Sequence, residues 1–141
     1  MITKIQSISD IITNSSSEVF VMEERDVEYY NNLDAGGCIR TFPITMNWLQ
    51  SQDGRYEWEM ICHVCDLDQT EVRGEYRDNG WWSYYEDPDE ETWKAFLELH
   101  KDVIEKRIED LYWVDIEDHF EDAKSVISSA RNDALWMASR H

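Results

Sequence analysis

The sequence has few cysteines, few basic residues and no long apolar run. Three cysteines in 141 residues are an odd number without the spacing of a disulfide framework, which argues against a disulfide-stabilised scaffold. No run of 18 apolar residues is present, so we expect no membrane span. The N-terminal MITKIQSISDIIT lacks the apolar core and the cleavage site of a signal peptide. We therefore expect a soluble cytoplasmic chain with reduced thiols.

Basic residues are scarce, because 13 Lys and Arg stand against 31 Asp and Glu, a net charge of −18. Such a surface repels DNA, RNA and anionic membranes, so we expect no direct nucleic-acid or membrane ligand. It attracts basic protein surfaces instead. The chain nevertheless contains 42% hydrophobic and 13% aromatic residues, which is too much apolar material for a disordered acidic chain.

The length predicts a single α+β domain over residues 1–141, with residues 1–86 mainly β and containing short helices. Helices are expected over 4–12 and 23–33, and strands at 19–21 and 38–46, the latter at a sheet edge because of Pro43. Apolar residues alternate in RYEWEMICHVC (55–65), and Asn79-Gly80 is a strong hairpin turn. We therefore expect a three-stranded antiparallel meander over 55–86.

Residues 87–141 are expected to form an antiparallel helix pair that packs on this sheet. Asp87-Pro88-Asp89 favours a helix start, and the first helix is expected to end near Tyr112. Trp113-Val114 would connect it to a second helix with Asp115 as its N-cap. Apolar residues step by four and three along that second helix as a coiled-coil-like seam: Ile116, Phe120, Ala123, Ile127, Ala130, Ala134 and Met137.

One segment near the N-terminus carries a resemblance. ITNSSSEVFVM (Ile12 to Met22) resembles a short signature, Asn-Ser-Ser-Ser followed closely by Phe, of small uncharacterised phage and phage-derived bacterial proteins. The resemblance implies a viral source, hence a host cytoplasm, and implies no fold or catalytic residue. We expect the serines to form a turn, because no G-x-S-x-G or S-x-x-K motif surrounds them as in serine enzymes.

The histidines and cysteines give only weak metal candidates. Cys62, His63 and Cys65 form half of a zinc motif, with Cys38 as a further ligand, but strand alternation would point Cys62 and Cys65 to opposite faces. No E-x-x-H motif accompanies His119, which argues against a di-metal carboxylate enzyme. His100 is expected as a hydrogen-bonded boundary residue. We expect no cofactor and no catalytic residues.

The most informative stretch is Glu86 to Asp122, which holds 15 acidic residues against four basic ones. Helical spacing aligns several of its carboxylates along one face, and successive carboxylates about 6 Å apart approach the ~7 Å spacing of phosphates. Trp82 or Tyr84 would act as an aromatic anchor for the partner. The candidate partner-binding acids are Glu91, Glu98, Asp102, Glu105, Glu109, Asp115, Asp118 and Asp122.

These features favour a non-enzymatic, acidic binding protein of phage type. In this hypothesis it imitates nucleic-acid phosphates and occupies a basic groove of a host nucleic-acid-handling or defence protein. Two alternatives stay open. One is a homo-oligomeric scaffold that associates through the Ile116–Met137 seam or through the Trp/Tyr strand at 81–86, and the other is a metal-dependent enzyme.

Overall fold

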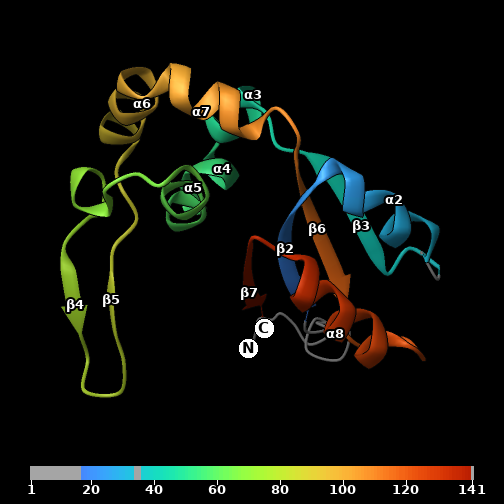
Figure 1. The fold of residues 1–141 in the computed structure, drawn as a ribbon. Coiled ribbons are helices and arrows are strands. Elements are labelled where there is room, and N and C mark those ends of the chain that lie inside the picture. Colours follow the sequence, from blue (N-terminus) through green and yellow to red (C-terminus); the bar gives the residue numbers. More distant parts are fainter. Residues whose placement is uncertain (1–16, 34–35, 141) are drawn as a thin grey trace. The chain divides into compact units, whose positions relative to one another are not determined.

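The computed structural model describes residues 17–33 and 36–140, which form two compact units (Figure 1). Unit 1 comprises Met1–Pro43 and Asp110–His141, and unit 2 comprises Ile44–Glu109. The α+β class predicted from the sequence is confirmed. The helix expected over 4–12 and the serine turn before Ser17 lie outside the described residues.

Unit 1 contains a four-stranded antiparallel sheet in the order β3-β6-β2-β7. Its strands are β2 (Ser17–Glu23), β3 (Ile39–Pro43), β6 (Leu111–Glu117) and β7 (Trp136–Arg140). β3 is an edge strand, as its Pro43 predicted. Because Pro43 of β3 pairs with Tyr112 of β6, unit 2 is an insertion between two neighbouring strands.

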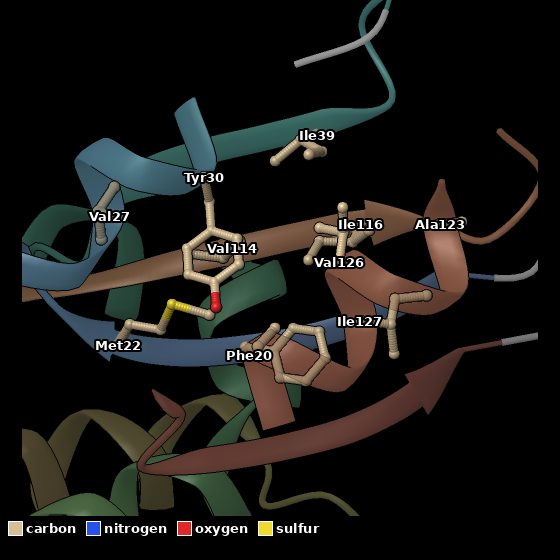
Figure 2. Packing of buried hydrophobic residues seen from close by; sticks show 11 residues of the cluster. Phe20, Met22, Val27, Tyr30, Ile39, Val114, Ile116, Ala123, Val126 and Ile127 are labelled. Atoms are coloured by element: carbon tan, nitrogen blue, oxygen red, sulfur yellow. The ribbon is translucent and has the colours of Figure 1, made fainter. Parts of the chain in front are cut away.

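Two helices, α2 (Glu24–Asn32) and α8 (Ala123–Asp133), pack on one face of this sheet (Figure 2). Alternate residues of β2 and β6 supply the sheet side of the core, as period-2 alternation requires. The Tyr30 hydroxyl of α2 lies 3.0 Å from Ser129 Oγ and donates to Asp133 at 2.7 Å, which ties α2 to α8. The buried cluster comprises Phe20, Met22, Val27, Tyr30, Ile39, Val114, Ile116, Ala123, Val126, Ile127 and Ala130.

The predicted C-terminal helix pair is wrong. Trp113-Val114 and Asp115 are not a helix connection and an N-cap, because all three lie within strand β6. The apolar seam is divided among β6, α8 and β7, and Ile116, Ile127 and Ala130 are buried inside unit 1. The segment LYWVDIE fits a strand as well as a helix, because its apolar residues also repeat every second position. Tyr112, Val114 and Ile116 lie on the core face of the strand.

Unit 2 is mainly helical. Its elements are α3 (Met46–Leu49), α4 (Gln52–Tyr56), α5 (Trp58–Cys65), the 3-10 helix η1 (Gln69–Glu71), β4 (Tyr76–Asp78), β5 (Ser83–Tyr85), α6 (Glu90–Leu99) and α7 (Lys101–Ile108). The predicted hairpin is confirmed between β4 and β5, but its two central turn residues are Gly80 and Trp81, because the Asn79 backbone N–H donates to Trp82 O at 3.2 Å. Two buried tryptophans form hydrogen bonds inside unit 2. Trp93 Nε1 donates to Leu49 O at 2.6 Å, and Trp58 Nε1 donates to Asp87 Oδ1 at 2.8 Å.

The predicted strand over residues 55–65 is wrong, because these residues form the end of α4 and then α5. Gly54 also belongs to α4 and does not break the chain. A Cβ at that position would lie 2.1 Å from Trp48 O, so only glycine fits there. The meander expected over 55–86 is therefore reduced to the β4–β5 hairpin.

The first predicted C-terminal helix begins where expected. Asp89 is the N-cap of α6, and its carboxylate accepts from the Thr92 backbone N–H at 2.7 Å. The helix is interrupted at His100 (φ −106°), and α7 then ends at Ile108, short of Tyr112. His100 is a hydrogen-bonded boundary residue as predicted, with Nε2 3.0 Å from Glu71 Oε1. Among residues 17–33 and 36–140, no helix has both the length and the apolar character needed to cross a membrane.

Candidate functional site

The outer face of α6 and α7 carries the acidic residues that the sequence singled out. Trp93, Phe96, Leu97, Ile104 and Ile108 are buried on the inner face, which leaves the acids in solvent. Five of the predicted acids lie on this face, and all are exposed: Glu91, Glu98, Asp102, Glu105 and Glu109. Within the described part of the chain, none of these five carboxylates has an ion-pair partner.

This face is less regular than the sequence predicted. The interruption at His100 separates Glu91 and Glu98 from Asp102 and Glu105 of α7 and from Glu109 at its C-cap, so the carboxylates do not follow one continuous helix. Lys94 and Lys101 line an open groove of about 470 Å³ together with Glu98 and Glu105. The negative face therefore has one edge of mixed sign.

The β4–β5 hairpin belongs to the same unit and precedes α6 directly (Figure 1). Trp81 is 88% exposed and Trp82 62% exposed, while Tyr84 of β5 is 48% exposed. Large aromatic side chains bury most of their surface in ordinary folded chains. The hairpin therefore presents a concentrated aromatic surface in the same unit as the acidic helices.

Polar contacts order this hairpin. The Asn79 carboxamide oxygen accepts from the backbone N–H groups of Trp81 (3.0 Å) and Trp82 (3.1 Å), which fixes the turn that carries both indoles. The Arg77 guanidinium contacts Glu86 at 3.2 Å, and this carboxylate raises the arginine pKa. The Arg73 guanidinium lies 4.0 Å from the centroid of the Tyr85 ring. The backbone of the turn that carries both indoles is therefore ordered before any partner binds.

The structure places the other three predicted acids in unit 1, and it does not align them along a helix. Asp115 lies in β6, where Arg40 contacts its Oδ2 at 3.2 Å. Asp118 is exposed in the turn after β6, and Asp122 stands at the N-cap position of α8 without a side-chain cap hydrogen bond. The expectation that Asp115, Asp118 and Asp122 would extend the acidic face along a second helix is therefore wrong.

The cysteine motif of α5 is a packing feature. Cys62 and Cys65 are buried in a helix, not on opposite faces of a strand, while His63 is exposed. Burial raises the pKa of Cys62 to about 12 and that of Cys65 to about 11, so both thiols are protonated at neutral pH. Protonated thiols are poor nucleophiles.

Cys38, Glu117 and His119 form a different cluster, which was not predicted from the sequence. The potential ligand atoms of these residues all lie within 4.8 Å of one another. Residues 38 and 117 are far apart in sequence, so only the pairing of β3 with β6 brings them together. Cys38 also follows two glycines that end the preceding helix. Such glycines indicate that a new strand or helix begins at this point, but they do not indicate a metal ligand.

No protein-family model, curated protein or solved structure matches this chain. The resemblance of Ile12 to Met22 to phage proteins therefore stays a prediction.

Proposed function

We propose that this chain is a non-enzymatic binding protein, an inhibitor of phage type that docks unit 2 on the basic groove of a nucleic-acid-handling protein. The observation that carries the proposal is the exposure of Trp81 and Trp82 on an ordered hairpin of a strongly acidic unit. Unit 2 contains 17 acidic and 7 basic residues, a net charge of −10.

The two surfaces supply different parts of recognition. Carboxylates without cationic partners on α6 and α7 attract and orient a basic surface, as phosphates do. Exposed indoles supply the apolar contact that gives a complex its lifetime, since Trp and Tyr dominate binding energy at interfaces. An acidic surface without exposed aromatic side chains would only make the protein soluble. Exposed aromatic side chains without the acidic surface would not favour a basic partner. Their presence in one compact unit supports a partner that is both basic and partly apolar.

The ordered state of the hairpin also supports binding. A two-stranded hairpin is marginal by itself in water, so its side-chain contacts decide whether its backbone stays ordered. Asn79 and Arg77 supply such contacts here. A pre-ordered surface loses less conformational entropy on association, which raises its affinity.

The test is retention of host proteins by the immobilised full chain, with duplex DNA as competitor. The proposal predicts a basic nucleic-acid-binding protein that is retained at low salt, released at high salt and displaced by DNA. Full retention in the presence of excess DNA, or capture of acidic proteins only, would contradict the proposal.

One alternative keeps a specific observation in its favour. The hairpin that would contact a partner would also pair with a second copy of this chain, because Trp81, Trp82 and the strand edges are exposed. The other route to self-association, the Ile116–Met137 seam, is largely used inside unit 1. Sedimentation at low and high salt separates the two functions: a salt-resistant oligomer favours self-association, and a monomer favours the basic partner.

A further inference from the structure

We propose that Cys38, Glu117 and His119 of unit 1 form a binding site for a single Zn²⁺ ion. The site is independent of the acidic surface of unit 2. It offers one sulfur, one carboxylate oxygen and one imidazole nitrogen, a donor set that suits zinc.

Strand pairing holds two of the three ligands. Ile39 pairs with Ile116, and the Glu117 backbone N–H donates to Cys38 O at 2.9 Å immediately beyond that pair. Ile39 and Ile116 face the helices, so alternation places Cys38 and Glu117 on the opposite face. The backbone thus fixes the spacing of the thiol and the carboxylate.

The third ligand comes from the turn after β6. His119 Nε2 lies 3.5 Å from Glu117 Oε2, and its side chain is 53% exposed. Two donors on a tetrahedral zinc are about 3.6 Å apart, given bond lengths of about 2.0–2.3 Å. Donor atoms within 4.8 Å of one another are close to this spacing, and the exposed imidazole is able to rotate toward the other two ligands.

The charges around the cluster fit a divalent cation. Thiolate and carboxylate together neutralise Zn²⁺, while Glu117 Oε1 lies 4.0 Å from Arg40 and leaves Oε2 toward the histidine. Cys38 is buried and His119 is exposed, so the cluster reaches solvent on the side of the histidine. Three protein ligands with a fourth position open to water are the arrangement of an accessible zinc site.

The site differs from the zinc motif that the sequence suggested. Cys62 and Cys65 are buried in α5 with raised pKa values, and the described residues supply no third ligand beside them. The two groups of residues provide a matched control within the same chain. Substitutions in either group remove cysteine and histidine side chains, but only those at Cys38 and His119 should lower the affinity for zinc.

The experiment uses the full, untagged chain, freed of metal by a chelator and titrated with Zn²⁺ in excess Mg²⁺, which occupies sites made of carboxylates alone. We expect one zinc per chain, and weakening of at least ~10-fold in both Cys38→Ser and His119→Ala. Cys62→Ala/Cys65→Ala and His63→Ala should retain wild-type affinity.

Cobalt provides a second measurement that does not depend on the stability of the Cys38 variant. Co²⁺ bound to the wild type should show thiolate-to-cobalt charge-transfer absorption, and His119→Ala should lose it at the same metal concentration. His119 is exposed, so its removal should leave circular dichroism unchanged. Absence of stoichiometric zinc, equal affinity in His119→Ala, or loss of zinc only in the Cys62/Cys65 variant would overturn the proposal.

Discussion

Trp81 and Trp82 are the side chains from which we expect most of the binding energy. Both stand on a turn that Asn79 fixes, and neither contributes to the buried core. The sequence identified Trp82 and Tyr84 as anchors but not Trp81, because strand alternation describes a paired strand and not the tip of a hairpin. Trp81 is the most exposed of the three.

Truncation of the two indoles tests this assignment. Trp81→Ala and Trp82→Ala should each weaken partner binding by at least ~2 kcal/mol, about 30-fold, without lowering the melting temperature. Met137→Ala, which removes a half-exposed apolar side chain from unit 1, is the control and should bind normally. Titration calorimetry with the captured partner measures all three, and wild-type affinity in both Trp variants would contradict the role.

The buried thiols predict a loss of stability in alkali. Burial raises the pKa of Cys62 from 9.0 to about 12, whereas the unfolded thiol ionises near 9.0. The folded chain therefore binds more protons than the unfolded chain above pH ~9, and the free energy of unfolding should fall there by up to ~1.4 kcal/mol per pH unit for each such thiol. Urea unfolding from about pH 8 to about pH 11 measures this slope.

The double variant Cys62→Ala/Cys65→Ala should reduce that slope. Tyr30, whose pKa is raised from 10.0 to about 12 mainly by burial, should leave a smaller slope above pH ~10 in the same variant. An unchanged slope in the double variant would show that the thiols do not ionise differently in the folded and unfolded chains.

Among the helices and strands, local signals predicted those elements whose ends carry specific chemistry. Asn79-Gly80 identified the hairpin, Asp89 identified the start of α6, and Pro43 identified an edge strand. Each signal reflects a local property of the backbone. Gly80 adopts a positive φ, the Asp89 carboxylate accepts from a free N–H group at the helix start, and Pro43 has no N–H group to donate to a further strand. Such requirements are visible without tertiary contacts.

Elements buried on several sides were not predictable in this way. In α5 the apolar residues cover most of the helix, so alternating positions also fit a strand. The exposed residues Glu59, His63 and Asp66 step by four and three, and that polar stripe was the better signal of a helix. In β6, tertiary pairing with β2 and β3 overrides a pattern that also fits a helix.

The N-cap of α6 provides a prediction with an internal control. The Asp89 carboxylate accepts from the Thr92 N–H, and this hydrogen bond lowers the Asp89 pKa. Asp89→Ala should lower the melting temperature by about 3–5 °C. Asp122→Ala removes an aspartate at the N-cap position of α8 that forms no such bond, so it should have a much smaller effect. Equal effects in thermal denaturation would contradict the capping role.

For the chain as a whole, the insertion of unit 2 between β3 and β6 links the folding of the two units. Closing an unfolded loop of about 66 residues costs roughly 4 kcal/mol, and a folded unit 2 removes most of that cost. The single domain expected from the sequence predicts one calorimetric transition with equal calorimetric and van't Hoff enthalpies. Two separate transitions would show that the units unfold independently.

The candidate sites show how far the sequence alone reaches. Exposed carboxylates on α6 and α7 follow from helical spacing and composition, which are local properties. The cluster of Cys38, Glu117 and His119 depends on strand order, and the position of Asp115 in strand β6 instead of a helix depends on the fold of unit 1. Sequence patterns therefore predicted the charge of the surface but not the positions of all the groups assigned to it.

The central claim is that the carboxylates of α6 and α7 bind a basic partner. The most direct measurement compares partner affinity at low salt for two triple variants with the same net charge. One is Glu98→Lys/Asp102→Lys/Glu105→Lys, on the acidic face, and the other is Glu24→Lys/Glu28→Lys/Glu121→Lys, at exposed positions of unit 1. We predict a loss of at least ~30-fold for the first variant, near wild-type binding for the second, and wild-type circular dichroism for both. Equal affinities for the two variants would contradict the claim.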